Sequence, residues 1–299
     1  MFKGVYTAII TPFHKGKVDE KKLEELVALQ VKAGVQGVVP CGTTGESILL
    51  SSEEQKRVIE ICVNVCKGKI KVVPATGALT TADTICLTQQ AQNVGADGVV
   101  IINPWYVKPS QESLFEYYKT INDNIDLPLI VYNNPTRTGV DTSSETMIKL
   151  SSYQNIQGYK DCSCCLQRVS ELKCVLGNRY SLLSGNDDPF AAHLAMGGDG
   201  GILVASNVVP DIFVTLMNAW CEGDLPLFKA TWKSVFPLLS ALSLESNPAP
   251  IKYAMGLVHG VSGESRLPFV PLKPATCLAI ETSLQRLGLL NDFAAPRER

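Results

Sequence analysis

The residue in this sequence best suited to covalent chemistry is a lysine at the end of a strand-like segment. Lys160 stands in "YKD" (159–161), after a segment that begins at residue 155. Most lysines at strand ends are solvated loop residues. A lysine among apolar strand ends, however, has a lowered pKa, and its free amine can attack a carbonyl carbon. The hypothesis therefore depends on the polar groups that the fold brings to it.

Two threonines between glycines could bind the carboxylate of a carbonyl substrate. The segment "GTTGE" (42–46) is equally compatible with an ordinary tight turn. In the functional interpretation, the backbone amides of Thr43 and Thr44 hold a carboxylate, and a threonine hydroxyl transfers a proton.

A tyrosine and an arginine in "YNNPTRTG" (132–139) extend this set. Tyr132 could be a half-buried aromatic and Arg137 a surface cation. Together they offer a proton carrier and a bidentate carboxylate ligand.

Short apolar segments alternate with helical patterns through the first 224 residues. About eight strand–helix units of this kind, with strands too apolar to face water, predict an α/β fold, a closed (β/α)8 TIM barrel. A doubly wound open sheet is the alternative, but no G-x-G-x-x-G follows the first strand. We predict strands at 5–10, 37–42, 71–76, 97–103, 127–133, 155–160, 180–185 and 200–206.

The pattern becomes entirely helical in the last quarter of the chain, with helices expected at 226–243, 248–260 and 273–289. We therefore predict a barrel that carries the active site in residues 1–224 and a C-terminal helical region in residues 225–299. A barrel's active site lies at the carboxyl ends of its strands. The four segments that contain "GTTGE", "YNNPTRTG", "YKD" and "SGNDD" are thus expected to share one rim.

Composition excludes several other classes of protein. The 299 residues are 45% hydrophobic with a formal net charge of −2, and no basic stripe suited to nucleic acid is present. No apolar segment approaches the roughly 18 residues of a membrane span. We expect a cytoplasmic protein without nucleic-acid or membrane partners.

The ten cysteines do not predict a metal site or a disulfide framework. The cluster Cys162, Cys164 and Cys165 lacks a second pair at zinc-ligand spacing. The three histidines are scattered at positions 14, 193 and 259. We expect reduced thiols and no metal.

Taken together, the motifs G-T-T-G-E, Y-N-x-P-x-R-T-G, G-x-K-D/E and S-G-N/D-D resemble those of the dihydrodipicolinate synthase family of lysine biosynthesis. The resemblance covers essentially the whole chain. It implies that Lys160 forms a Schiff base with pyruvate and that the enamine adds to the aldehyde of L-aspartate 4-semialdehyde. The product would be 4-hydroxy-tetrahydrodipicolinate, formed without a cofactor because the covalent iminium is the electron sink.

The same resemblance implies a role for each site residue. Thr43, Tyr132 and Tyr106 would form a proton relay, with Tyr106 supplied by a neighbouring subunit of a homotetramer that is a dimer of dimers. Thr44 would hold the pyruvate carboxylate and Arg137 that of the semialdehyde. The backbones of Gly185 and Ile202 would line the pocket, with Glu46, Asn247 and Asp187 as supporting candidates.

Two alternative functions remain open from the sequence. One is another Schiff-base aldolase, such as a sialate or sugar-acid lyase, which is not expected to carry the R-T-G of "NNPTRTG". The other is a catalytically silent barrel used for binding, which should lack a member of the relay.

Two departures from the family pattern carry expectations of their own. Tyr159 is large for its position, but alternation along a strand should turn it outward and leave Lys160 inside. The residues Ile48 and Leu79 suit a charged amino acid poorly, so we expect insensitivity to L-lysine.

Overall fold

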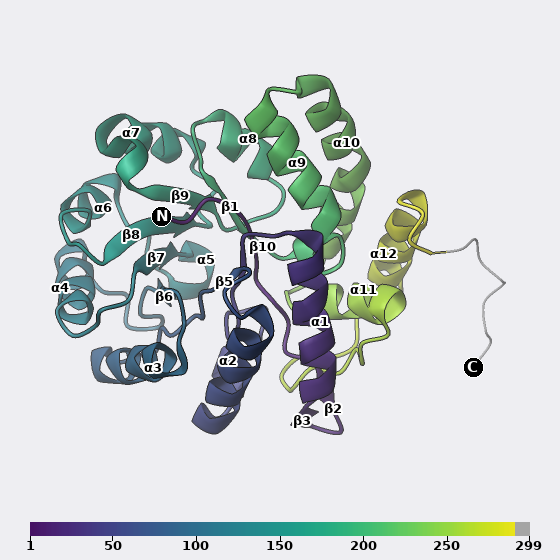
Figure 1. Ribbon diagram of the computed structural model, residues 1–299, viewed down its shortest axis with the longest axis horizontal. Helices are drawn as coiled ribbons and strands as arrows, with labels where there is room; N and C mark the ends of the chain where they lie inside the picture. The colour runs from purple at the N-terminus through teal and green to yellow at the C-terminus, as the bar shows by residue number, and fades with distance from the viewer. Residues whose placement is uncertain (291–299) are drawn as a thin grey trace.

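The computed structural model describes residues 1–290, in which eight strands form one parallel sheet in the order β5-β4-β1-β10-β9-β8-β7-β6. A bridge between Ala75 and Val100 joins the two edges and closes the barrel (Figure 1). The predicted TIM barrel is confirmed. The strands are β1 Gly4–Thr7, β4 Gly37–Val38, β5 Lys71–Val72, β6 Val99–Ile102, β7 Leu129–Asn133, β8 Ile156–Asp161, β9 Ser181–Ser184 and β10 Gly200–Leu203.

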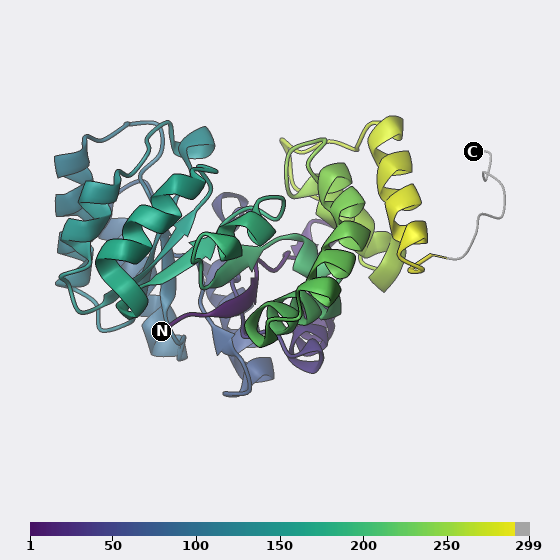
Figure 2. The same cartoon turned by 90° about the horizontal axis from the view of Figure 1, so that it is seen from above.

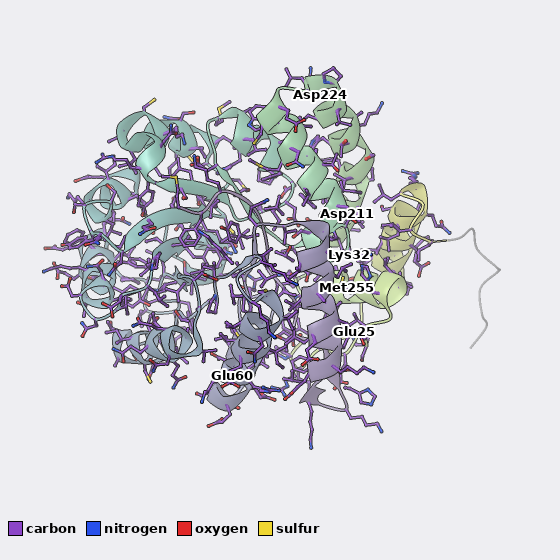
Figure 3. All side chains as sticks on the ribbon, in the orientation of Figure 1. Glu25, Lys32, Glu60, Asp211, Asp224 and Met255 are labelled. Atoms are coloured by element: carbon purple, nitrogen blue, oxygen red, sulfur yellow. The ribbon has the colours of Figure 1, made fainter. Side chains whose placement is uncertain are left out.

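Helices surround the barrel, and a short hairpin of β2 (Phe13–His14) and β3 (Lys17–Val18) precedes the first of them. Charged side chains such as those of Glu25, Lys32 and Asp211 lie exposed on this outer layer (Figure 3). The helices of the barrel are α1 Glu20–Ala33, α2 Ser52–Cys66, α3 Thr81–Val94, α4 Gln111–Asn122, α5 Pro135–Thr138, α6 Ser144–Leu150, α7 Leu166–Leu176, α8 Phe190–Ala195 and α9 Pro210–Glu222.

Local sequence explains where the helices begin and end. The side chain of Ser51 accepts from the amide of Glu54, whose carboxylate accepts in return from the amide of Ser51, a capping box that starts α2. Helix α1 ends at Gly34, which adopts φ +79°, a conformation that disfavours residues with a side chain.

Two apolar clusters follow from the alternation of side chains along the strands. Ile130 and Tyr132 of β7 point into the barrel, while Leu129 and Val131 pack outward against the helices. On β8, Tyr159 packs in the outer cluster and is 2% exposed, as predicted from its place next to Lys160.

The strands β4 and β5 are shorter than the apolar segments predicted at 37–42 and 71–76. Each segment contains a proline, Pro40 or Pro74, that has no N–H to donate to a neighbouring strand. The carbonyl of Pro74 still accepts from the amide of Val100 at 2.9 Å, and this bond helps to close the barrel.

Three helices beyond the barrel form a layer on one flank (Figure 2): α10 Leu225–Leu242, α11 Ala249–His259 and α12 Pro274–Arg286. Helix α10 packs against α9 on one side and against α12 on the other. A division of the chain after residue 224 stays a prediction, and the last nine residues of the predicted region, 291–299, lie outside the described residues. No helix in residues 1–290 is long and apolar enough to cross a membrane.

Candidate active site

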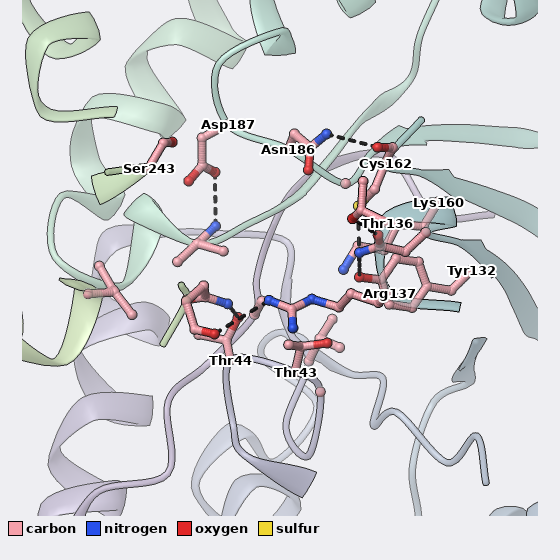
Figure 4. Close-up of a pocket in the computed structure, with 18 of the residues that line it drawn as sticks. Thr43, Thr44, Tyr132, Thr136, Arg137, Lys160, Cys162, Asn186, Asp187 and Ser243 are labelled. Carbon is pink, nitrogen blue, oxygen red and sulfur yellow. Dashed lines mark hydrogen bonds between the residues drawn. The ribbon is translucent and has the colours of Figure 1, made fainter. Parts of the chain in front are cut away.

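A cavity of about 370 Å³ opens where the strands end, and Figure 4 shows residues that line it. The four polar segments identified from the sequence each contribute to its lining, through Thr43 and Thr44, Tyr132 and Arg137, Lys160, and Gly185 to Asp188. The C-terminal helical region contributes as well, through residues that include Ser243 and Asn247. The cavity is therefore a joint product of the barrel and the helices beside it.

Lys160 extends from β8 into the base of this cavity. The residue is 7% exposed, and Nζ lies 4.0 Å from the ring centroid of Tyr132. Burial lowers the pKa of Lys160, as does nearby Arg137, while Cys162 and Asp187 act in the opposite direction. The amine is thus more available as a nucleophile at neutral pH than that of a surface lysine.

Glycine is required at position 185 because the lysine passes close to it. A Cβ on Gly185 would collide with the sulfur of Cys162 and lie 3.1 Å from Cε of Lys160. The amide of Gly185 also donates to the carbonyl of Asp161 at 2.8 Å. This glycine therefore leaves space for the lysine and joins β8 to the loop after β9.

Tyr132 stands beside Lys160 because the two residues are register partners on adjacent strands. Its hydroxyl accepts a hydrogen bond from Nδ2 of Asn134 at 2.9 Å and lies 3.8 Å from Sγ of Cys162. Burial raises the pKa of Tyr132, and the phenol consequently keeps its proton at neutral pH. The group can donate a proton to a reacting atom and take it back.

The "GTTGE" loop is held on two sides. Oγ1 of Thr44 accepts from Nδ2 of Asn247 at 2.9 Å, and the carbonyl of Asn247 accepts from Arg137 at 3.4 Å. At the end of the loop, the carboxylate of Glu46 pairs with Lys252 and accepts from the amide of Arg266 at 3.0 Å. Asn247 thus connects the two residues predicted to bind carboxylates.

Within the described part of the chain, three of the predicted site residues lack the hydrogen bond or the cavity contact that their predicted roles require. Thr43 lines the cavity, but in residues 1–290 no hydrogen bond joins its hydroxyl to that of Tyr132. Ile202 lies in the inner apolar cluster with Tyr132, and the wall of the cavity on that side includes Val204. Tyr106 is 88% exposed, has φ +70°, and does not reach the cavity of its own chain.

Sequence reasoning missed two groups next to the tyrosine. Asn134, the donor to Tyr132, lies two residues after it in the quoted motif, and this spacing was a usable signal. Cys162 was considered only as a metal ligand, yet it lies two residues after Lys160 and therefore on the same face. In residues 1–290, no group of three or more His, Cys, Asp or Glu side chains is placed to hold a metal ion.

Known proteins of one family match the chain along nearly its whole length. The model of the dihydrodipicolinate synthetase family matches residues 1–287. The 4-hydroxy-tetrahydrodipicolinate synthase of Bradyrhizobium diazoefficiens is 41% identical over 290 residues, which are 97% of this chain and 98% of the relative. That of Parvibaculum lavamentivorans is 42% identical over 291 residues, 97% of this chain and 100% of the relative.

Solved structures agree with these relatives. The dihydrodipicolinate synthase of Aquifex aeolicus has a TM-score of 0.94 and 38% identity, covering 96% of this chain and 99% of its own. The chloride-inhibited enzyme of Acinetobacter baumannii, complexed with pyruvate, has a TM-score of 0.94 and 35% identity, covering 97% and 100%. The chain therefore belongs to the dihydrodipicolinate synthetase family.

Proposed function

We propose that the protein is a lyase that condenses pyruvate with L-aspartate 4-semialdehyde to give 4-hydroxy-tetrahydrodipicolinate, in the diaminopimelate and lysine biosynthesis route. The observation that carries the proposal is the buried amine of Lys160, which faces the cavity beside the protonated hydroxyl of Tyr132. Its support is the full-length similarity to synthases of this name.

The proposed reaction begins with attack of the Lys160 amine on the keto carbon of pyruvate. Water leaves and an iminium forms, which makes the methyl group acidic enough to lose a proton and become an enamine. The enamine carbon then bonds to the aldehyde carbon of the semialdehyde. The amino group that came from the semialdehyde next attacks the iminium carbon, and the amine of Lys160 leaves as the ring closes. No metal or organic cofactor is needed for any of these steps.

The proton transfers are assigned to Tyr132, with Thr43 and Tyr106 as further members of the relay. Tyr132 is supported by its position next to Nζ of Lys160 and by the hydrogen bond from Asn134, which orients the hydroxyl. Thr43 is supported by its place in the cavity lining. Backbone groups of Gly185 and Ile202 remain proposed contacts of the substrate.

The two substrates carry carboxylates, and two groups are assigned to them. Thr44 is proposed to bind that of pyruvate, and Arg137 that of the semialdehyde. Arg137 extends across the cavity towards Thr44 (Figure 4), and Asn247 contacts both. A guanidinium suits a carboxylate because its N–H groups match the two oxygens.

An oligomer is proposed because the relay includes a residue far from the cavity. Tyr106 projects from the loop between β6 and α4 together with Val107, which is 60% exposed. A neighbouring chain of a tetramer, built as a dimer of dimers, would receive this tyrosine in its own cavity. Mixing inactive Tyr106→Phe and Lys160→Ala subunits should then restore activity. Absence of rescue after demonstrated subunit exchange would contradict a shared site.

Two experiments test the central proposal. Incubation with pyruvate and borohydride should modify Lys160, as located by peptide mapping, and the modification should disappear in Lys160→Ala. Condensation with the semialdehyde should then exceed cleavage of sialic acid. If pyruvate is trapped but sialic acid is cleaved faster than the semialdehyde is condensed, the result would favour the sialate lyase alternative instead.

We also propose a cellular location for the protein and its response to L-lysine. A cytoplasmic location is favoured by ten cysteines that are all free thiols. Insensitivity to L-lysine is favoured by Ile48, which lines a second cavity of about 310 Å³ with Trp105 and cannot pair with a charge. Titration with L-lysine at saturating substrates should leave the initial rate unchanged, and a saturable decrease at submillimolar lysine would contradict this.

A further inference from the structure

Behind the reacting lysine, on the outer face of the barrel wall, lies a network centred on Arg168. Nη1 and Nη2 of this buried arginine donate to the two carboxylate oxygens of Asp141 at 2.9 and 2.7 Å. Nη1 also lies 3.3 Å from a carboxylate oxygen of Asp161. The side chain of Asp161 is 7% exposed, whereas that of Asp141 is 46% exposed. One guanidinium thus forms ion pairs with two carboxylates.

The network connects the two strands that carry the reacting groups. Nδ2 of Asn133 donates to Asp141 at 2.7 Å and to Asp161 at 3.0 Å. Asn133 and Asp161 are register partners, and so are Tyr132 and Lys160 one position earlier. Because neighbouring residues on a strand point to opposite faces, each outward polar residue is adjacent in the chain to an inward reacting residue.

Arg168 occupies a position in its helix that local electrostatics disfavours. It lies in the first turn of α7, which begins at Leu166, and a cation there opposes the helix dipole. The two carboxylates offset this effect. The arginine also neutralises one of two negative charges that would otherwise stand together behind Lys160, and of these two carboxylates Asp161 is the buried one.

We propose that Arg168 is a positioning residue for the reaction of Lys160, which fixes β8 against β7 through Asp161 and Asn133 and limits the negative charge behind the nucleophile. This inference rests on the proposed Schiff-base chemistry. It assigns to Arg168 no contact with a substrate.

The charged groups around Lys160 and around the Arg168 network determine whether loss of the arginine raises or lowers the pKa of Lys160. Lys160 is faced by Tyr132 from β7, Arg137 from α5, Asp187 from the loop after β9 and Cys162 from its own strand. Asp161 is faced, besides Arg168 and Asp141, by the residues Tyr159, Cys162, Cys164 and His193. Removal of the arginine charge would leave two carboxylates to stabilise the ammonium form of Lys160 and would raise its pKa.

The test measures how fast pyruvate and cyanoborohydride modify Lys160 as a function of pH. The midpoint of the rise in rate should move upward by about half to one pH unit in Arg168→Met. It should move downward in Asp161→Asn, which removes a negative charge instead. Shifts of opposite sign distinguish a charge effect from general loosening of the fold, and Asp161→Asn provides a test even if Arg168→Met does not fold.

A matched control lies on the same helix. Lys173 of α7 pairs with Asp199 at 3.0 Å, and Asp199 directly precedes β10, at the opposite end of the barrel from the cavity. Lys173→Met should reduce stability without moving the midpoint. The inference is overturned if the wild type is trapped at Lys160 but neither network variant moves the midpoint, or if Lys173→Met moves it equally. If the wild type is not trapped at any pH, the proposed function itself fails.

A second readout separates geometry from charge. Arg168→Lys keeps the positive charge but lacks the planar group that spans both carboxylates. Its midpoint should match that of the wild type, while the maximal trapping rate should fall about three- to tenfold, since a small displacement of a reacting group is enough to lower a rate. A maximal rate equal to that of the wild type would overturn the positioning role.

Discussion

Two buried lysines in this molecule have similar surroundings and very different partners. Lys160 lies 4.0 Å from the ring centroid of Tyr132, and Lys252 lies 4.1 Å from that of Phe13. Burial lowers the pKa of both. Lys252, however, pairs with the carboxylate of Glu46 and donates to the carbonyl of Glu264 at 2.9 Å, whereas Lys160 faces an open cavity.

The comparison shows that burial by itself does not make a lysine a nucleophile. The Glu46 carboxylate and the Glu264 carbonyl hold Lys252 as an ammonium, which has no lone pair with which to attack a substrate. Lys160 is buried without such a partner among residues 1–290, and its amine is accessible from the cavity. The first lysine is thus suited to chemistry and the second to holding the "GTTGE" loop in place.

The largest expected effect is the loss of turnover on replacing the reactive lysine. Lys160→Ala and Lys160→Arg should each lower kcat by at least about a thousandfold, because the nucleophile is removed or remains protonated. Both should stay folded by circular dichroism, since Lys160 forms no ion pair within the described residues 1–290. Pyruvate still trapped by borohydride in Lys160→Ala would show that another amine reacts.

Replacement of the structural lysine should mainly affect stability. Lys252→Met leaves Glu46 as a buried carboxylate without its cation, and we expect the free energy of unfolding to fall by about 3–5 kcal/mol in urea titrations. Trapping of pyruvate at Lys160 should persist in the folded fraction. The double variant Glu46→Gln with Lys252→Met is the control and should recover much of the loss. If Lys252→Met were as stable as the wild type but pyruvate could no longer be trapped, the assignment of the two lysines would be reversed.

A smaller effect is expected at the arginine that shares the cavity with Lys160. Arg137→Ala should raise the KM for the semialdehyde about ten- to a hundredfold, which corresponds to the loss of one charge-assisted contact of about 1.5–3 kcal/mol. The KM for pyruvate should change much less. Equal changes in steady-state assays for both substrates would indicate a purely structural arginine.

The smallest effect concerns the pH dependence of stability. The pKa of Lys160 is lower in the folded protein than in the unfolded chain, so the unfolded chain binds more protons between the two values. Lys160 therefore destabilises the fold fully below its folded pKa, and this penalty disappears as the pH rises towards about 10.4. In urea titrations the advantage of Lys160→Met over the wild type should shrink from pH 7 to pH 10. A constant difference would contradict the lowered pKa.

Much of the fold was predictable because the periodicity of the strands and helices is strong. The helices predicted at 226–243 and 248–260 agree with α10 and α11 to within a residue at each end. Strand ends were less predictable, since Pro40 and Pro74 interrupt the ladder inside segments that are otherwise strand-like. The short helix α5 was not predicted, because Asn, Pro and Thr in "YNNPTRTG" are equally typical of a turn.

The amino-acid sequence by itself determined the barrel, the rim and the outward turn of Tyr159, because these follow from local periodicity and from alternation along a strand. Only the tertiary structure decided which distant groups meet there. Asn247 reaches Thr44 across 203 positions of the chain, and Arg168 of α7 reaches Asp141 in the loop between α5 and α6. Hydrogen bonds and charges act over a few ångströms in space, whatever the separation in sequence, and that distance is set only when the helices pack against the closed barrel.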